Sequence, residues 1–214
     1  MISDTLDLLH KSALVPVLRA QTRALADAAL ECLAQTGFDT VEITLTIPEG
    51  EDLIRAWARK GMCVGAGTVM DLDSARRCIA AGARYVVSPV LVDGLPQLCH
   101  EAGIPCMLGA FTPTEVARAE AMGADVVKVF PAKAGGGPSY ISALRDVFPN
   151  TPLVPTGGVS AGNLAEFLRA GAAFVGSGGS MFDFDALARG DAEAAKARLG
   201  EFKRAVEDYQ KEVQ

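Results

Sequence analysis

Short, valine-rich apolar runs alternate along this chain with longer stretches in which apolar residues recur at helical spacing. One such stretch carries Leu25, Ala28, Ala29, Cys32 and Leu33, the pattern of a helix with one buried face. The apolar runs are rich in β-branched residues, as is typical of strands buried on both faces. Eight runs are predicted as strands, over residues 13–19, 38–45, 62–67, 84–88, 104–110, 124–130, 152–156 and 173–176.

A glycine stands before most of the predicted strands, where the preceding helix would end. These glycines are Gly37, Gly61, Gly82, Gly103, Gly123 and Gly171. They recur about 20 to 24 residues apart, except for a last interval twice as long, and such a period indicates a repeated supersecondary unit. The missing position falls at Pro149-Asn150, so we expect Asn150 to adopt the left-handed conformation that glycine adopts at a helix end.

Strands that alternate with helices form a parallel sheet with the helices outside. Eight such units predict an α/β fold of the (β/α)8, or TIM-barrel, class. The main alternative is an open doubly wound sheet, but Arg19-Ala20-Gln21-Thr22 stands where its glycine-rich dinucleotide fingerprint would be. We therefore expect a single TIM-barrel domain over residues 1–214, with a barrel core over about residues 13–190. A short N-terminal helix over residues 2–11 and an extended, amphipathic C-terminal helix over residues 191–213 complete the prediction.

The charge balance excludes several classes of function. With 26 acidic and 20 basic residues, the chain has a formal net charge of −6, which argues against general binding to nucleic acid or to acidic membranes. Its apolar runs do not approach the ~20 residues that a membrane-spanning helix needs. The first residues carry acids rather than a basic segment, so we do not expect a signal peptide.

Cysteine and histidine usage gives no sign of a metal site. Five cysteines without CxxC spacing are typical of core thiols in a reducing cytoplasm, and not of disulfides or of zinc ligands. His10 and His100 both lack a second metal-type ligand at a useful spacing. A His-based metal or nucleophile-activating site is therefore not expected.

Candidate chemistry centres on Lys128, which lies inside the apolar sixth strand. Desolvation disfavours the ammonium form of a buried lysine, and the free amine is the nucleophile that Schiff-base chemistry on a carbonyl requires. The alternative is a lysine that extends from the strand end into solvent or pairs with a carboxylate.

Glu42, Thr44 and Thr46 alternate with apolar residues in the second strand and share one face. In a barrel strand flanked by helices the polar face lines the lumen, where a carboxylate needs a partner or a function. Lys128 is the expected partner. In a functional pair Glu42 would transfer protons while Lys128 forms the imine. The alternative is an ion pair that only fills the lumen, although such a pair rarely stabilises more than an apolar replacement.

Two glycine pairs follow the last two predicted strands, where barrels of this class commonly hold a phosphate on backbone N–H groups and a helix N-terminus. The two segments are Thr156-Gly157-Gly158 and Gly178-Gly179-Ser180. After the sixth strand, Gly135-Gly136-Gly137 is either a flexible loop or a further source of donors. Lys133 in this loop is expected to be solvated; its alternative roles are attraction of a phosphate and the imine itself.

In order and spacing, these segments resemble the class I aldolases of the 2-keto-3-deoxy-6-phosphogluconate (KDPG) and 4-hydroxy-2-oxoglutarate (KHG) type, including the 6-phosphogalactonate branch. The resemblance spans about residues 13–190. The matching segments are Val15-Pro16-Val17-Leu18-Arg19, Val41-Glu42-Ile43-Thr44-Leu45, Val64-Gly65-Ala66-Gly67-Thr68-Val69, Ser88-Pro89, Val127-Lys128-Val129-Phe130-Pro131-Ala132, Pro155-Thr156-Gly157-Gly158-Val159 and Gly178-Gly179-Ser180.

The resemblance implies a homotrimeric TIM barrel that needs no metal or other cofactor and acts on a small phosphorylated keto acid. Lys128 would be the Schiff-base lysine and Glu42 the general acid/base. The implied carboxylate contacts are Arg19, Gly67 and Thr68. The implied pocket residues are Thr44, Thr46, Pro89 and Phe130. The implied phosphate contacts are Thr156, Gly157, Gly158, Gly178, Gly179 and Ser180.

One position departs from the gluconate-type pattern. Many of those members carry an arginine four residues after the glutamate, where this chain has Thr46. The segments 41–48 and 137–144 look more like the phosphogalactonate branch, in which the arginine of the first strand takes the carboxylate. Arg19 offers the same planar fork from an adjacent strand, its alternative role being a pair with Glu42. The departure leaves the sugar epimer open.

The expected function is reversible Schiff-base cleavage of a 2-keto-3-deoxy-6-phospho sugar acid, of the phosphogluconate or phosphogalactonate type, to pyruvate and glyceraldehyde 3-phosphate. Cleavage of 4-hydroxy-2-oxoglutarate to pyruvate and glyoxylate is a further expected activity. One alternative is a phosphate-binding isomerase or lyase that uses Lys128 as a general acid and that borohydride would not trap. The other is a non-catalytic binder of a phosphorylated metabolite, which would be stabilised by its ligand without turnover.

Overall fold

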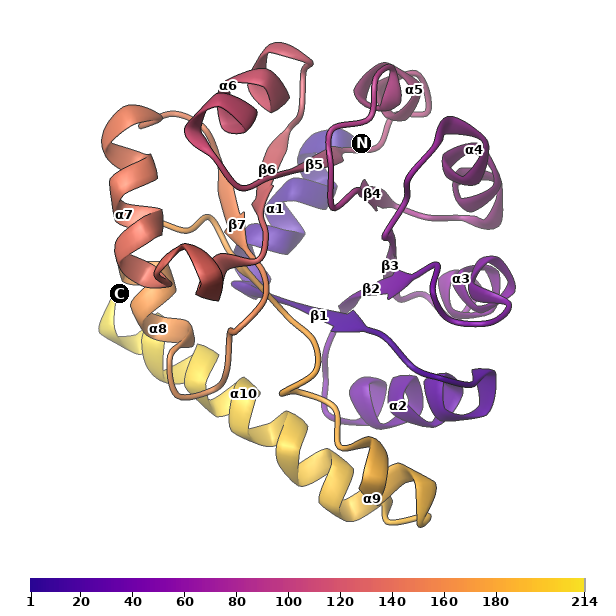
Figure 1. Cartoon of the computed structure of the whole chain (residues 1–214). Coiled ribbons are helices and arrows are strands. Elements are labelled where there is room, and N and C mark those ends of the chain that lie inside the picture. The colour runs from indigo at the N-terminus through magenta and orange to yellow at the C-terminus, as the bar shows by residue number, and fades with distance from the viewer. Residues whose placement is uncertain (214) are drawn as a thin grey trace.

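The computed structural model describes residues 1–213, and within them parallel strands form a ring surrounded by helices (Figure 1). The strands are β1 (Leu14–Leu18), β2 (Thr40–Thr44), β3 (Cys63–Gly67), β4 (Tyr85–Val87), β5 (Cys106–Ala110), β6 (Val126–Val129), β7 (Leu153–Pro155) and β8 (Val175–Ser177). Each strand lies beside its neighbour in the sequence, and β8 returns to pair with β1. The TIM-barrel prediction is confirmed.

The ring is closed between β7 and β8. Thr156, just beyond β7, forms an isolated parallel bridge with Gly176 of β8. The backbone N–H of Ala173 also donates to the carbonyl of Leu153 at 2.9 Å. Closure removes the exposed sheet edges that an open sheet would leave.

Helices follow the strands around the outside of the ring. They are α1 (Ile2–Ser12), α2 (Arg23–Gln35), α3 (Gly50–Arg59), α4 (Leu72–Ala81), α5 (Leu95–Glu101), α6 (Pro113–Ala121), α7 (Pro138–Val147), α8 (Leu164–Arg169), α9 (Phe184–Ala188) and α10 (Ala192–Glu212), with a short 3₁₀ turn, η1 (Ala132–Gly135). The short helix α9 and the turn η1 were not predicted from the sequence. Along the described chain, the helices lack the combination of length and apolar character needed to cross a membrane.

Two hydrophobic cores hold the barrel together. The larger one lies between the strands and the helices and includes Val41 and Ile43 of β2. The smaller one fills the lumen with side chains from the opposite strand faces, among them Tyr85 and Met107. Leu9 of α1 belongs to this inner core, so α1 closes the end of the lumen at which the strands begin.

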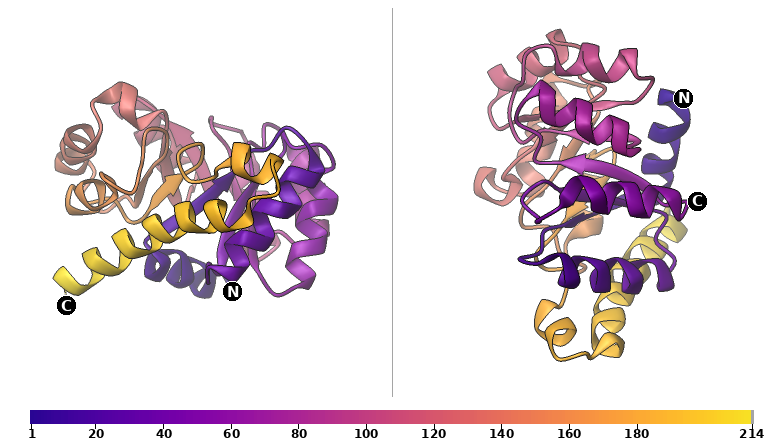
Figure 2. Two further views of the ribbon diagram at one scale, coloured as in Figure 1. Left: turned by 90° about the horizontal axis from the view of Figure 1, so that it is seen from below. Right: turned by 90° about the vertical axis from the view of Figure 1, so that its right-hand side faces the viewer.

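The two ends of the chain pack on the barrel without belonging to the ring. Figure 2 shows α1 beneath the strands and α10 running along the outside. The long helix α10 contacts α2, α8 and α9, and buries Leu199, Phe202 and Val206. The prediction of a short N-terminal and an extended C-terminal helix is confirmed within one or two residues.

One prediction about the helix ends is wrong. Outside glycine, the described residues with positive φ are Ala13, Glu49 and Thr68, so Asn150 does not adopt the left-handed conformation. Instead α7 ends at Val147, and Arg145 holds the chain beyond it by donating to the carbonyls of Phe148 at 3.4 Å and Thr151 at 3.1 Å. The last turn itself is closed by the N–H of Phe148, which donates to the carbonyl of Leu144 at 2.8 Å, and the Arg145 side chain orders the segment that follows.

Candidate active site

Lys128 and Glu42 meet inside the barrel, although they lie 86 residues apart in the chain. Lys128 is on β6 and Glu42 on β2, and each side chain points into the lumen. The lysine Nζ lies 3.1 Å from Oε1 and 3.4 Å from Oε2 of the carboxylate. Both side chains are buried, with 6% and 5% of their surfaces exposed. A paired lysine and carboxylate at this depth cost desolvation free energy, which indicates a chemical role.

Gly67 of β3 provides the space that the Glu42 carboxylate occupies. A Cβ atom at this position would lie 2.2 Å from Oε1 of Glu42, closer than any real contact. A contact of Gly67 with the substrate carboxylate stays a prediction; in the structure this glycine lies against the carboxylate of Glu42. A side chain here would force Glu42 away from Lys128.

Tyr85 of β4 lies in the inner core, close enough to Glu42 for the two charges to interact if the phenol ionised. Its ring occupies the space beside Gly65, and its hydroxyl lies 3.0 Å from the hydroxyl of Thr40. Burial raises the pKa of Tyr85 well above that of an ordinary phenol, and the nearby Glu42 contributes in the same direction. The phenol is therefore neutral and adds no charge to the lumen.

A cavity of about 1290 Å³ opens over Lys128, at the carboxyl ends of the strands. Val17, Pro89 and Phe130 form apolar parts of its wall. The ring of Phe130 is 40% exposed, and its centroid lies 5.9 Å from Nζ of Lys128. A small keto acid in this cavity would have the lysine amine at its base.

Arg19 lies at the rim of the cavity, just beyond β1. Its guanidinium donates to the hydroxyl of Thr46 at 3.2 Å and to the hydroxyl of Thr68 at 3.3 Å. Glu42 is bonded to Lys128, so the alternative pairing of Arg19 with Glu42 is not the arrangement in this structure. Thr68 has φ near 60°, a left-handed conformation that is unfavourable for a β-branched residue and is often found at functional sites.

The two threonines predicted for the pocket do not line this cavity. Thr44 is fully buried, and its hydroxyl lies 2.9 Å from that of Thr46. Thr46 contacts the rim only through Arg19. Thr46, just beyond β2, therefore supports the arginine, while Glu42 within β2 is bonded to Lys128.

The loops after β7 and β8 form the opposite end of the cavity. All six residues predicted there line it: Thr156, Gly157, Gly158, Gly178, Gly179 and Ser180. In the described part of the chain, the backbone N–H groups of Gly157, Gly158, Gly179 and Ser180 donate to no protein acceptor. These free donors suit an anion. The helices that follow, α8 and α9, span only six and five residues, so the loop N–H groups and not a helix dipole provide the site.

Several lining residues were not singled out from the sequence. They include Val17, Pro138, Ser160, Asn163, Phe167 and Phe184. Asn163 orders the loop after β7: its side chain donates to the carbonyl of Gly158 at 3.0 Å and accepts from the N–H of Ser160 at 2.8 Å. A Ser-x-x-Asn segment just before a helix is the signal that could have identified it.

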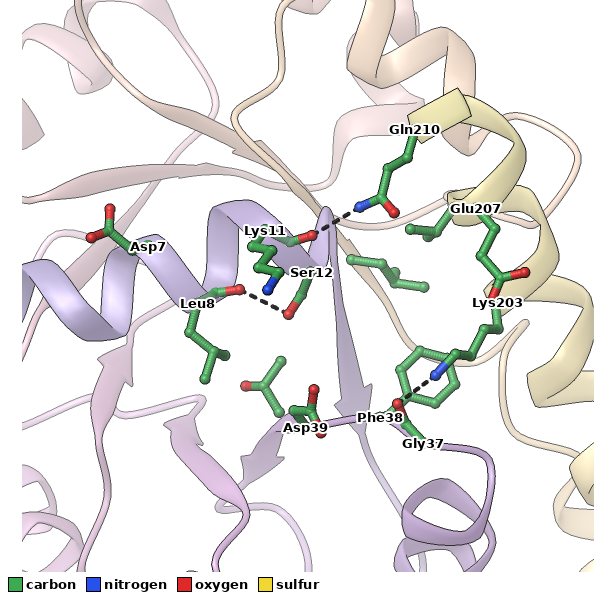
Figure 3. Close-up of a pocket in the computed structure, with 13 residues that line it drawn as sticks. Asp7, Leu8, Lys11, Ser12, Gly37, Phe38, Asp39, Lys203, Glu207 and Gln210 are labelled. Atoms are coloured by element: carbon green, nitrogen blue, oxygen red, sulfur yellow. Dashed lines mark hydrogen bonds between the residues drawn. The ribbon is translucent and has the colours of Figure 1, made fainter. Parts of the chain in front are cut away.

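A second cavity, of about 540 Å³, lies at the other end of the barrel between α1 and α10 (Figure 3). Its polar groups mainly join the two chain ends to the barrel. Lys203 donates to the carbonyl of Gly37 at 2.5 Å, and Gln210 donates to the carbonyl of Lys11 at 2.9 Å. Lys128 does not line this second cavity. The hydrogen bonds of Lys203 and Gln210 there connect α10 to the segment before β2 and to α1.

The described residues provide no cluster of three or more histidine, cysteine, aspartate or glutamate side chains able to hold a metal ion. The five cysteines are free and buried. Burial raises the pKa of Cys78 to about 12, and burial also raises the pKa of Cys63. The cavity over Lys128 is lined by no cysteine among the described residues, so the lysine is the buried nucleophile with access to it.

Comparison with known proteins agrees with this geometry. The family described as KDPG and KHG aldolase matches residues 6–197. A protein of Rhizobium meliloti (strain 1021) described as a probable 2-dehydro-3-deoxy-6-phosphogalactonate aldolase is 35% identical over 173 residues, which cover 79% of this chain and 81% of that protein.

Solved structures agree over most of the barrel. The native KDPGal structure has a TM-score of 0.81 and 28% identity, and the match covers 92% of this chain and 96% of that one. The KDPG aldolase of Legionella pneumophila, with pyruvate captured as a covalent carbinolamine, has a TM-score of 0.80 and 27% identity, over 91% of this chain and 96% of that one.

Proposed function

The chain belongs to the KDPG and KHG aldolase family and is a class I aldolase, a carbon–carbon lyase, and from this premise we propose that it cleaves a 2-keto-3-deoxy-6-phospho sugar acid through an imine on Lys128. The products would be pyruvate and glyceraldehyde 3-phosphate. The observation that carries the proposal is the buried pair of Lys128 and Glu42 at the base of the cavity, with Nζ and Oε1 3.1 Å apart.

The first half of the reaction forms the imine. Glu42 accepts a proton from the ammonium group of Lys128, and the free amine attacks the C2 ketone to give a carbinolamine. Loss of water, with a proton returned through Glu42, gives the imine. The short distance between the two groups supports this transfer without a large movement of either side chain.

The second half breaks the carbon–carbon bond. Glu42, acting directly or through a water molecule, removes the proton of the C4 hydroxyl. The C3–C4 bond breaks, its electron pair moves into the imine to give an enamine, and the aldehyde leaves. Protonation at C3 and addition of water to the imine then release pyruvate and regenerate Lys128.

The rim of the cavity supports a site for the substrate carboxylate. Arg19 presents a planar guanidinium there, held by Thr46 and Thr68. Such a fork binds a carboxylate through two parallel hydrogen bonds. Thr68 would add a hydroxyl contact on the same side. The carboxylate would then lie next to the ketone that Lys128 attacks.

We further propose that the galactonate epimer is the preferred substrate. Thr46 stands where gluconate-type members carry arginine, and Arg19, just beyond β1, would bind the carboxylate in its place. The R. meliloti relative carries a phosphogalactonate description, which supports the same choice. The test is kcat/KM for the two purified epimers; a clear preference for the gluconate form would contradict it.

We also propose that the protein is a homotrimer, as the family resemblance implies. Two apolar side chains beyond β3 and β4, Met70 and Val90, are 53% and 40% exposed and would be covered in such an assembly. Light scattering coupled to size-exclusion chromatography should give three times the mass of the chain. A monomer mass at micromolar concentration would contradict this proposal.

The imine is tested by incubating the protein with pyruvate and borohydride, followed by mass spectrometry of the intact and digested protein. We expect one stable adduct on the peptide that carries Lys128, and none in Lys128→Met. An adduct on Lys133, or no adduct in folded protein, would overturn the assignment.

A further inference from the structure

Lys133 lies at the end of the cavity that the loops after β7 and β8 form, and hydrogen bonds of its backbone hold it there. It belongs to the turn η1, directly after β6. The N–H of Lys133 donates to the carbonyl of Gly157 at 3.0 Å, and the N–H of Ala132 donates to the carbonyl of Thr156 at 2.9 Å. These two bonds join the turn to the loop after β7. Lys133 is therefore in a defined position, although it is exposed.

The side chain of Lys133 packs on Gly158. A Cβ atom at Gly158 would lie 2.4 Å from Cβ, 3.0 Å from Cδ and 3.1 Å from Cγ of Lys133. The aliphatic part of the Lys133 side chain thus packs directly on Gly158. A side chain at position 158 would displace the lysine side chain. This packing directs the side chain along the loop whose N–H groups are free to bind an anion.

The charge of Lys133 has no carboxylate partner. Within residues 1–213 the lysines in ion pairs are Lys60, Lys128, Lys196 and Lys211. The other residues at this end of the cavity are neutral: Thr156, Gly157, Gly158, Ser160, Asn163 and Ser180. The remaining cations of the lining, Arg19 and Lys128, belong to the carboxylate and carbonyl positions. Lys133 therefore provides the positive charge at the end of the cavity formed by the loops after β7 and β8.

We propose that Lys133 determines the preference of this aldolase for a substrate tail that ends in a phosphate dianion. The proposal rests on the aldolase function proposed above. Neutral N–H groups donate hydrogen bonds to any anion of the right size. The attraction between a lysine and a bound anion, in contrast, grows with the charge of that anion. A phosphate ester carries about −1.5 to −2 at pH 7, and a hydroxyl tail carries no charge. The lysine therefore favours the phosphorylated substrate over the same molecule without phosphate.

The test compares two acceptors in the synthetic direction, with pyruvate as donor. The measured quantity is kcat/KM for glyceraldehyde 3-phosphate divided by kcat/KM for glyceraldehyde. Lys133→Gln should lower this ratio by about 10-fold or more, and Lys133→Arg, which keeps the charge, should restore most of it. Lys11→Gln is the matched control, because Lys11 is an exposed lysine at the opposite end of the barrel.

Inhibition by inorganic phosphate, competing with glyceraldehyde 3-phosphate, provides a second readout. Its inhibition constant should rise in Lys133→Gln and stay the same in Lys11→Gln. An unchanged acceptor ratio and an unchanged inhibition constant would overturn the role of Lys133. Failure of pyruvate trapping on Lys128 in the unmodified protein would instead overturn the proposed function; binding of inorganic phosphate, measured by calorimetry, would then still test Lys133.

Discussion

At the scale of single residues, the buried pair of Lys128 and Glu42 is the central feature of this protein. It contributes little to stability by itself, because the attraction between the charges is offset by the loss of hydration. Each buried side-chain nitrogen and oxygen atom in residues 1–213 nevertheless has a hydrogen-bond partner. The pair is therefore compatible with the fold, and its chemistry explains its presence better than its energy does.

A double substitution separates these two contributions. Lys128→Met alone should lower the free energy of unfolding by about 3–5 kcal/mol, because it leaves Glu42 as a buried charge without a partner. Lys128→Met combined with Glu42→Leu should restore stability to that of the parent or above it, and still show no aldol cleavage. Urea denaturation and a coupled pyruvate assay measure the two quantities. A double variant as unstable as the single one would indicate a structural pair.

Gly67 gives a second prediction at this scale. Gly67→Ala should lower kcat about 10-fold or more, since a Cβ atom 2.2 Å from Oε1 would displace Glu42, the proposed general acid/base, from Lys128. Pyruvate trapping by borohydride should fall less than kcat does. The control is Gly200→Ala in α10, where the nearest atom to the new Cβ is the end of the Arg204 side chain at 3.5 Å. That control should keep full activity and gain about 0.5–1 kcal/mol of stability.

At the scale of elements, the loops after the strands are held by side-chain caps. Thr112 and Glu115 form a capping box at the start of α6, in which the Thr112 hydroxyl accepts from the N–H of Glu115 at 3.3 Å. The carboxylate of Glu115 accepts from the N–H groups of Phe111 and Thr112 at 2.8 and 2.7 Å. The carbonyl of Phe111 in turn accepts from the hydroxyl of Tyr140 in α7. The cap therefore connects the loop after β5 to the segment beside η1.

Thr112→Ala should lower the free energy of unfolding by about 1 kcal/mol, the usual effect of losing such a cap. Chemical denaturation at neutral pH measures it. Thr114→Ala in the first turn of the same helix is the control, with an expected change within about 0.5 kcal/mol.

The other half of the box predicts a pH dependence. The N–H donors of Thr112 and Phe111 hold the pKa of Glu115 below that of an ordinary carboxyl group. A lowered folded-state pKa means that the ionised cap stabilises the protein fully above the ordinary carboxyl value of about 4.3. This contribution is lost as the pH falls through the lower folded-state value. Glu115→Gln should therefore reduce the acid-induced loss of stability between about pH 5 and pH 3; an unchanged profile would contradict this role.

At the scale of the whole molecule, the two ends of the barrel differ: one end is closed and packed, and the other opens into the cavity over Lys128. The outer core fixes the helices on the strands, and the inner core fills the lumen below the buried pair of Lys128 and Glu42. α1 closes the lumen at one end, and the cavity over Lys128 opens at the other. Stability can therefore be changed at the closed end with little effect on the open one.

Leu9→Ala tests this separation. The side chain is fully buried, so its truncation should cost about 2–5 kcal/mol and lower the melting temperature by several degrees. Well below the melting temperature, kcat and KM should stay within about twofold, because Leu9 and Lys128 lie at opposite ends of the lumen. A large change in kcat would show that α1 is coupled to the active site.

The sequence alone determined the barrel, because eight short apolar strands that alternate with helices at a nearly regular interval have few other ways to bury their apolar faces. It also predicted that Lys128 and Glu42 pair inside the barrel, because an ionisable residue within an apolar strand needs a partner or a function. The six residues after β7 and β8 that line the cavity were also named from the sequence, and four of them carry backbone N–H groups without a protein acceptor in the described residues. The end of α7 was not predicted correctly, because the helix already ends at Val147, and the Arg145 side chain holds the following segment by donating to the carbonyl of Thr151.

Only the tertiary structure decided which groups face one another. The clearance between Gly67 and Glu42, the supports of Arg19 and the packing of Lys133 on Gly158 all join segments from different strands or loops. Local patterns fix which face of a strand a residue occupies, but the distance between two faces depends on the register and closure of the whole ring. The pairing of Lys128 with Glu42 was therefore predictable from the sequence, whereas the space around the pair was visible only in three dimensions.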